Sequence, residues 1–130
     1  MNITKILNAI ILLTLISCSS KKTDEKIKIK PQILKIDVYE PSSVCDCSKD
    51  GIKTLNKMLK IRQRYQSLEN FNDDLKSVES ISLLKENWNL IREKCLRKFA
   101  TKLFAPTECN KPEKITELRG KLDDLKVSTS

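Results

Sequence analysis

Histidine does not occur among the 130 residues of this chain. It is the only side chain whose unperturbed pKa lies near neutrality, and it is the commonest metal ligand in proteins. Its absence excludes a Ser-His-Asp or Cys-His catalytic arrangement. Glycine occurs only at Gly51 and Gly120, so the chain has no glycine-rich loop that could cradle a phosphate. No residue pattern selects a catalytic group, and we expect that the protein is not an enzyme.

The scarcity of glycine and of aromatic residues also bears on the fold class. The chain contains one tryptophan, two tyrosines and three phenylalanines, whereas charged residues make up 32% of it. This composition favours helices over β-sheet. The length leaves room for one domain at most.

The first 17 residues, MNITKILNAIILLTLIS, have the character of an export signal. A single lysine precedes an apolar run that extends from about residue 6 to residue 16. This run is too short to cross a bilayer, which takes about 20 apolar residues. It has the length of the apolar part of a secretory signal peptide.

The segment Leu15-Ile16-Ser17-Cys18 closely resembles the lipobox of bacterial lipoproteins, in which a small residue directly precedes the cysteine. The resemblance implies cleavage after residue 17, a diacylglyceride on the Cys18 sulfur and usually an acyl chain on the new amine. Several acyl chains together give durable attachment to a membrane, whereas one chain does not. Ser19, in place of Asp, implies the outer membrane in an organism that has one. An ordinary secretory signal and an uncleaved membrane anchor are the alternatives.

The chain is basic, with a formal net charge of +8. Loss of residues 1–17 removes Lys5 and leaves 24 basic minus 17 acidic side chains, or +7. A basic chain often binds nucleic acid, but export argues against that partner. Anionic lipid headgroups, lipopolysaccharide or wall polymers are the anionic partners available in the cell envelope.

Residues 18–43 are predicted to be the lipidated cysteine followed by an extended tether. Isoleucine alternates with lysine around Ile27 and Ile29, which is typical of an extended chain. Pro31 and Pro41 interrupt the pattern and limit it to an edge strand or a free arm. The alternative is a strand offered to the edge of a partner's sheet.

Three amphipathic helices are predicted within residues 44–127. Their apolar positions recur at spacings of three and four, as on one face of a helix. The first begins near residue 50 with Asp50 as its cap and carries Ile52, Leu55, Leu59 and Leu68. The second runs from about 76–81 to 104 and carries Ile81, Leu84, Trp88, Ile91 and Cys95. The third begins around Pro112 and carries Ile115, Leu118, Leu122 and Leu125.

These helices predict an all-α fold, a small antiparallel bundle of about three helices. Each apolar stripe must be buried against the other two helices, so Trp88 is expected in the core. Residues 128–130 are expected to fray.

Four cysteines follow Cys18, namely Cys45, Cys47, Cys95 and Cys109. An even number of cysteines in a small exported domain predicts disulfides. An extended Cys45-Asp46-Cys47 segment would point both sulfurs to one side, toward Cys95 and Cys109. Both pairings of that kind, 45–95 with 47–109 and 45–109 with 47–95, remain open. A zinc site built from the four cysteines and a redox or soft-metal dithiol at Cys45 and Cys47 are the alternatives, and we predict neither a metal nor a cofactor.

These features favour a lipid-anchored protein of the cell envelope that acts by binding. The expected partners are the membrane, reached through Cys18, and another envelope protein. The chain would bind that protein as an accessory subunit of an envelope assembly, or as an inhibitor or immunity-type protein. Anionic lipid or a wall polymer is a further candidate, and nucleic acid is not expected. The alternative function is a thiol redox or metal carrier that uses Cys45 and Cys47.

Overall fold

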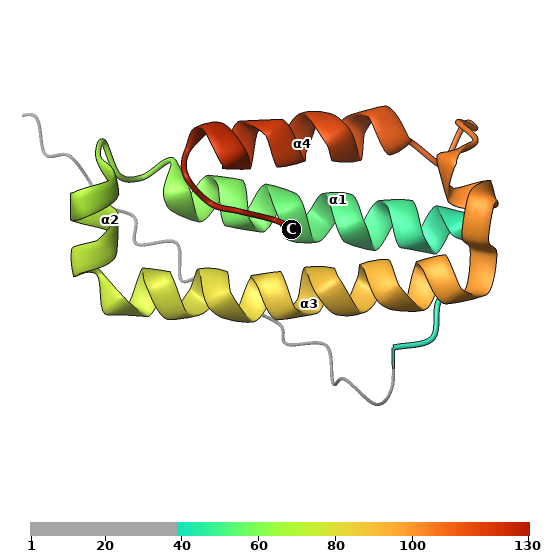
Figure 1. Cartoon of the computed structure of the whole chain (residues 1–130), viewed down its shortest axis with the longest axis horizontal. Helices are drawn as coiled ribbons and strands as arrows, with labels where there is room; N and C mark the ends of the chain where they lie inside the picture. Colours follow the sequence, from blue (N-terminus) through green and yellow to red (C-terminus); the bar gives the residue numbers. More distant parts are fainter. Residues whose placement is uncertain (1–38) are drawn as a thin grey trace, which may run out of the picture.

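Three long helices lie side by side along the long axis of the molecule (Figure 1). The structure is a computed structural model and describes residues 39–130. The long helices are α1 (Val44–Arg62), α3 (Leu75–Phe99) and α4 (Pro112–Asp124), and the turns contain α2 (Leu68–Asp73) and the 3₁₀ helix η2 (Ala100–Phe104). Helices α1 and α4 run in one direction and α3 runs in the other. The predicted all-α, antiparallel bundle of about three helices is confirmed, and the described residues contain no strand.

Helix α1 begins six residues earlier than the sequence suggested. Ser43 is its N-cap: the Ser43 hydroxyl accepts from the Asp46 amide at 3.2 Å, and the Asp46 carboxylate accepts from the Ser43 amide at 3.0 Å. This reciprocal pair is a capping box. The predicted cap, Asp50, instead lies inside the helix, where it accepts a hydrogen bond from the Tyr39 hydroxyl at 3.2 Å. The prediction of a helix starting near residue 50 was therefore wrong.

Helix α1 also ends earlier than predicted, so Leu68 is not part of its buried face. The chain turns after Arg62 and forms α2, in which Leu68 is 40% exposed. Asp74 then caps α3, since its carboxylate accepts from the amides of Lys76 and Ser77 at 3.2 and 3.3 Å. The Tyr65 hydroxyl donates to the same carboxylate, and this bond lowers the pKa of Asp74.

Helix α1 lies between α3 and α4 and packs against both, whereas α3 and α4 pack far less on each other. The larger cluster of buried apolar side chains lies along this sandwich. It contains Leu55, Met58, Leu59, Ile61, Phe71, Ile81, Leu84, Trp88, Leu118, Leu122 and Val127. The stripes predicted from the sequence for the second and third helices are therefore the faces that are buried or partly buried.

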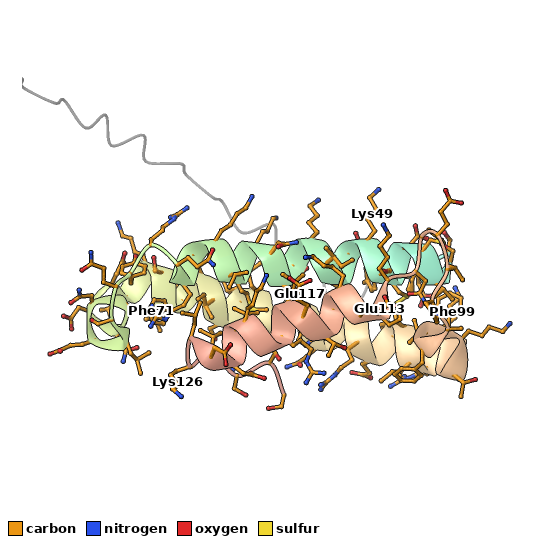
Figure 2. The ribbon with its side chains drawn as sticks, turned by 90° about the horizontal axis from the view of Figure 1, so that it is seen from above. Lys49, Phe71, Phe99, Glu113, Glu117 and Lys126 are labelled. Atoms are coloured by element: carbon orange, nitrogen blue, oxygen red, sulfur yellow. A yellow bond between two sulfur atoms is a disulfide. The ribbon has the colours of Figure 1, made fainter. Side chains whose placement is uncertain are left out.

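A smaller apolar cluster lies toward the other end of the bundle. It contains Tyr39, Cys47, Leu90, Ile91 and Cys95, with Phe99 and Leu103 packed against it. Figure 2 shows Phe71 of the first cluster and Phe99 of the second near opposite ends of the molecule. Because Tyr39 is only 8% exposed, the packed domain begins by residue 39 and not at residue 44 as predicted.

The last residues do not fray as predicted. The chain turns back after α4 and runs over the bundle (Figure 1). Thr129 is 1% exposed, and its carbonyl accepts a hydrogen bond from the indole Nε1 of Trp88 on α3 at 3.1 Å. Its hydroxyl accepts from the Nε of Arg119 on α4 at 3.1 Å. The tail thus bridges α3 and α4, which pack on α1 far more than on each other.

Candidate functional site

The four cysteines of the described residues form two disulfides, Cys45–Cys109 and Cys47–Cys95. The Cα atoms of the two pairs are 5.2 and 6.0 Å apart, within the range of natural disulfides. This is one of the two pairings that the sequence left open. Cys18 and the proposed signal peptide lie outside the described residues.

The Cys45-Asp46-Cys47 segment is helical and not extended as predicted. It forms the first turn of α1, where positions two apart point to nearly opposite sides because each residue turns the helix by about 100°. Cys47 therefore reaches α3, and Cys45 reaches the loop that precedes α4. Asp46 lies between the two cysteines, and hydrogen bonds from Ser42 and Ser43 to its carboxylate lower its pKa.

The two bridges differ in exposure. Cys47 and Cys95 are 4% and 2% exposed, whereas Cys45 is half-buried and Cys109 is exposed. A dithiol of the kind expected for a redox or metal carrier would need both bridges to open, because Cys45 and Cys47 are not bonded to each other.

An open pocket of about 260 Å³ lies between α3, η2 and α4, directly over the Cys47–Cys95 disulfide. It occurs between two helices that make few contacts with each other, since α3 and α4 both pack mainly on α1. Trp88 and Arg119, which both bond to Thr129 in the tail, also line the pocket. The tail therefore fills one part of the gap between α3 and α4, and the pocket occupies the next part.

The walls of the pocket are largely apolar. They are formed by Trp88, Ile91, Leu96, Leu103, Phe104, Pro112 and Ile115, together with the disulfide. Two of these side chains are unusually accessible for their size, since Phe104 is 67% exposed and Leu96 is 41% exposed. Apolar side chains that stay accessible at the edge of a concave apolar site are typical of a binding surface.

The uncharged polar groups of the pocket already have partners within the protein. The Ser48 hydroxyl accepts from the Lys111 amide at 2.9 Å, and the Thr116 hydroxyl donates to the Pro112 carbonyl at 3.1 Å. The side-chain amide of Asn110 donates to carbonyl oxygens of the η2 region, of which the nearest, that of Ala105, is 2.8 Å away. These bonds hold the pocket in shape.

Two guanidinium groups, those of Arg92 on α3 and Arg119 on α4, are the charged members of the pocket lining. No carboxylate lines the pocket, and neither arginine forms an ion pair with a described residue. Arg97, by contrast, is paired with Glu93 on the outer face of α3. The pocket therefore combines an apolar interior with uncompensated positive charge.

A row of basic side chains runs along α1 on the side away from the pocket. Its members, spaced by three or four positions, are Lys49, Lys53, Lys57, Lys60 and Arg64. This spacing places them on one face of the helix or its extension. None of the five forms an ion pair with another described residue, and Figure 2 shows Lys49 pointing away from α4. Arg62 does not belong to this row, because it is 4% exposed and donates to the Leu125 and Tyr65 carbonyls at 3.1 and 3.0 Å.

Sequence reasoning found the disulfide cysteines and the burial of Trp88 but not the pocket. Arg92 and Arg119 lie on different helices and carry no local sequence signal. Only the packing of the helices brings both arginines into the lining of one pocket.

Among residues 39–130, no helix combines the length and the apolar character needed to cross a membrane. In the same residues, no group of three or more His, Cys, Asp or Glu side chains is placed to hold a metal ion. Comparison of the chain with models of known protein families, with curated proteins and with solved structures finds no match.

Proposed function

We propose that this chain is a lipid-anchored binding module of the bacterial cell envelope. In this proposal Cys18 carries the lipid, the helical domain binds its partner without catalysis, and the pocket between α3, η2 and α4 is the binding site. The observation that carries the binding role is the accessible apolar pocket, because a small domain normally closes such a gap to bury apolar surface.

The envelope address is supported by two independent features. One is the resemblance of Leu15-Ile16-Ser17-Cys18 to a lipobox. The other is the pairing of all four cysteines of the described domain, since disulfides persist in the bacterial periplasm and at cell surfaces and are rare in the cytosol. Ser19 favours the outer membrane in an organism that has one.

The basic row on α1 supports a second contact, with anionic lipid headgroups or wall polymers. A cation close to an anionic membrane surface gains about 1 kcal/mol, so five unpaired cations on one face supply a substantial orienting force. The row lies on the side of α1 away from the pocket. Contact through the row would therefore leave the pocket open to the expected envelope partner.

Metabolic labelling with palmitate tests the anchor. We expect the parent chain to be labelled and a Cys18→Ala variant to be unlabelled, with a Ser19→Ala variant labelled as the matched control. Equal labelling of the Cys18→Ala variant would contradict the lipid anchor.

A thiol count on the denatured, non-reduced mature protein tests the alternative of a thiol redox or metal carrier. We expect no reactive thiol from Cys45, Cys47, Cys95 or Cys109. Two or more free thiols, or a metal that copurifies in stoichiometric amount, would favour the carrier.

Binding of a neutral, environment-sensitive apolar dye tests the pocket. Thr116 is exposed and lines the pocket, whereas Thr101 is exposed on η2 and does not. We expect Thr116→Phe to reduce the affinity for the dye by narrowing the pocket and Thr101→Phe to leave it unchanged. Equal affinities of the two variants would mean that the dye binds elsewhere.

A further inference from the structure

The pocket has the chemistry of a site for an amphiphilic anion. Its two charged lining residues, Arg92 and Arg119, come from different helices and have no carboxylate partner among the described residues. Arginine binds carboxylates and phosphates through two parallel hydrogen bonds, and such bonds are among the strongest in proteins. The bond from Arg119 Nε to Thr129 leaves the two terminal nitrogens of that guanidinium for a ligand.

The remaining lining favours an alkyl chain over a peptide. A peptide backbone needs donors and acceptors along its length, but the Ser48, Thr116 and Asn110 side chains are already bonded to groups of the protein. An alkyl chain needs only apolar walls, which Trp88, Ile91 and the other apolar lining residues provide.

The size of the pocket indicates one chain and not two. At about 260 Å³, it lies at or just below the lower end of the range of roughly 300–1,000 Å³ that is typical of small-molecule sites. Leu96 and Phe104 extend the apolar surface beyond the enclosed volume, so a longer chain could continue along them.

We propose that the pocket binds a single-chain amphiphilic anion, with the alkyl chain against the apolar walls and the anionic group at Arg92 and Arg119. This inference rests on the proposed function, because it names the ligand class of the same pocket. A domain anchored at a membrane would meet such molecules as fatty acids and as single-chain lipids with an anionic headgroup.

The chain carries its own reporter for a binding experiment. Trp88 is its only tryptophan and lines the pocket. The protein for the experiment is the mature chain, residues 18–130 with Cys18→Ser, exported under an ordinary secretory signal. Its tryptophan emission is followed during titration with decanoate, decanol and decyltrimethylammonium, each below the concentration at which it forms micelles.

We expect decanoate to bind at least tenfold more tightly than decanol, and decyltrimethylammonium to bind most weakly. Removal of one charged hydrogen-bond donor by Arg92→Gln should weaken decanoate binding by about tenfold and leave decanol binding nearly unchanged. Arg97→Gln on the same helix is the matched control, because Arg97 is paired with Glu93 and does not line the pocket. Arg92 has no hydrogen bond to the rest of the domain, so its loss should not affect folding.

Equal affinities for decanoate and decanol would overturn the anionic ligand while keeping an apolar pocket. Failure of every probe, including the neutral dye, would overturn the pocket as a binding site altogether. Decyl phosphate, which has the same chain length as decanoate, distinguishes the headgroups: whichever of the two binds more tightly identifies the anionic group of the ligand, and either result supports the proposal. Tighter binding of an apolar peptide with a free carboxyl end than of decanoate would overturn the lipid-like ligand in favour of a protein partner.

Discussion

Opening the two disulfides is expected to destabilise the domain by amounts that are not additive. Cys45→Ala with Cys109→Ala opens one bridge, and Cys47→Ala with Cys95→Ala opens the other. Each bridge, taken alone, closes a long loop of the unfolded chain, because its partners are 64 or 48 positions apart. The chain-entropy model gives about 4 kcal/mol for a single loop of either length.

The second bridge to form closes a much shorter loop. Cys45 and Cys47 are two positions apart, and Cys95 and Cys109 are 14 positions apart. The path between the second pair through the first bridge is therefore about 16 residues, for which the same model gives about 3 kcal/mol. Opening either bridge alone should cost about 3 kcal/mol, whereas opening both should cost about 7 kcal/mol. The excess of about 1 kcal/mol over the sum of the separate losses follows from the nested arrangement.

The identity of the bridge should also matter. Cys47 and Cys95 are almost fully buried, so alanine at both positions leaves a small cavity that costs about 1 kcal/mol more. Cys45 is only half-buried and Cys109 is exposed, so alanine at these two positions leaves no enclosed cavity. The two single-bridge variants should therefore differ, with the buried pair giving the larger loss.

Urea unfolding, followed by Trp88 emission and by helical circular dichroism, measures these losses. The free energy of unfolding of a native domain is about 5–15 kcal/mol, so the variant without either bridge should be close to unfolding in water. If the variant that lacks both bridges is no less stable than the variants that lack one bridge, the reasoning is refuted. A loss below about 1 kcal/mol from the buried bridge would also refute it.

Three further predictions concern the packing and the surface charge. Deleting residues 128–130 leaves the buried Trp88 indole donor without its partner, so the free energy of unfolding should fall by about 1–3 kcal/mol. The tryptophan emission should also shift to the red, and unchanged emission would contradict the docked tail. Gly51→Ala would place the new Cβ 3.1 Å from Trp88 Cζ3, so the free energy of unfolding should fall by about 1–3 kcal/mol. The matched change Gly120→Ala meets open space and should raise the free energy of unfolding, measured by thermal unfolding, by up to about 1 kcal/mol. Equal effects of the two changes would show that the Trp88 ring can move aside. Hydrogen bonds from two lysines lower the pKa of Glu117 from its ordinary value of 4.5 to about 2, so its contribution to stability is present above pH 4.5 and is lost as the pH falls toward 2. Glu117→Gln should flatten the pH dependence of unfolding in that window, and an unchanged slope would contradict the ion pairs.

Apolar periodicity was sufficient to predict the second and third long helices. The stripe from Ile81 to Cys95 is the buried face of α3, and Pro112 is the first residue of α4. Both helices bury one continuous face, so a period of 3.6 residues describes them well. Such a pattern reports which residues are buried but not which helix lies opposite.

The start of α1 was missed although the sequence contains its signal. Ser43 and Asp46 have the spacing of a capping box, whereas the two cysteines of Cys45-Asp46-Cys47 have a spacing that also fits an extended segment. The docking of Thr129 had no local signal, because it depends on the Trp88 indole of α3 and on Arg119 of α4, which are far apart in the sequence. The pocket is lined by residues of α1, α3, η2 and α4 together, so no pattern in one helix could indicate it.

The pocket and the disulfides are expected to depend on each other. Apolar walls attract one another in water, which favours closure of the η2 end of α3 onto α4. The two bridges oppose this closure: Cys47–Cys95 fixes α3 to α1 beneath the pocket, and Cys45–Cys109 fixes the loop before α4. Because Cys109 is exposed and the other bridge is buried, mild reduction should open Cys45–Cys109 first and leave the bundle folded. The partly reduced protein should then bind decanoate more weakly than the oxidised protein, while its helical circular dichroism stays the same; equal binding would mean that the core alone holds the pocket open.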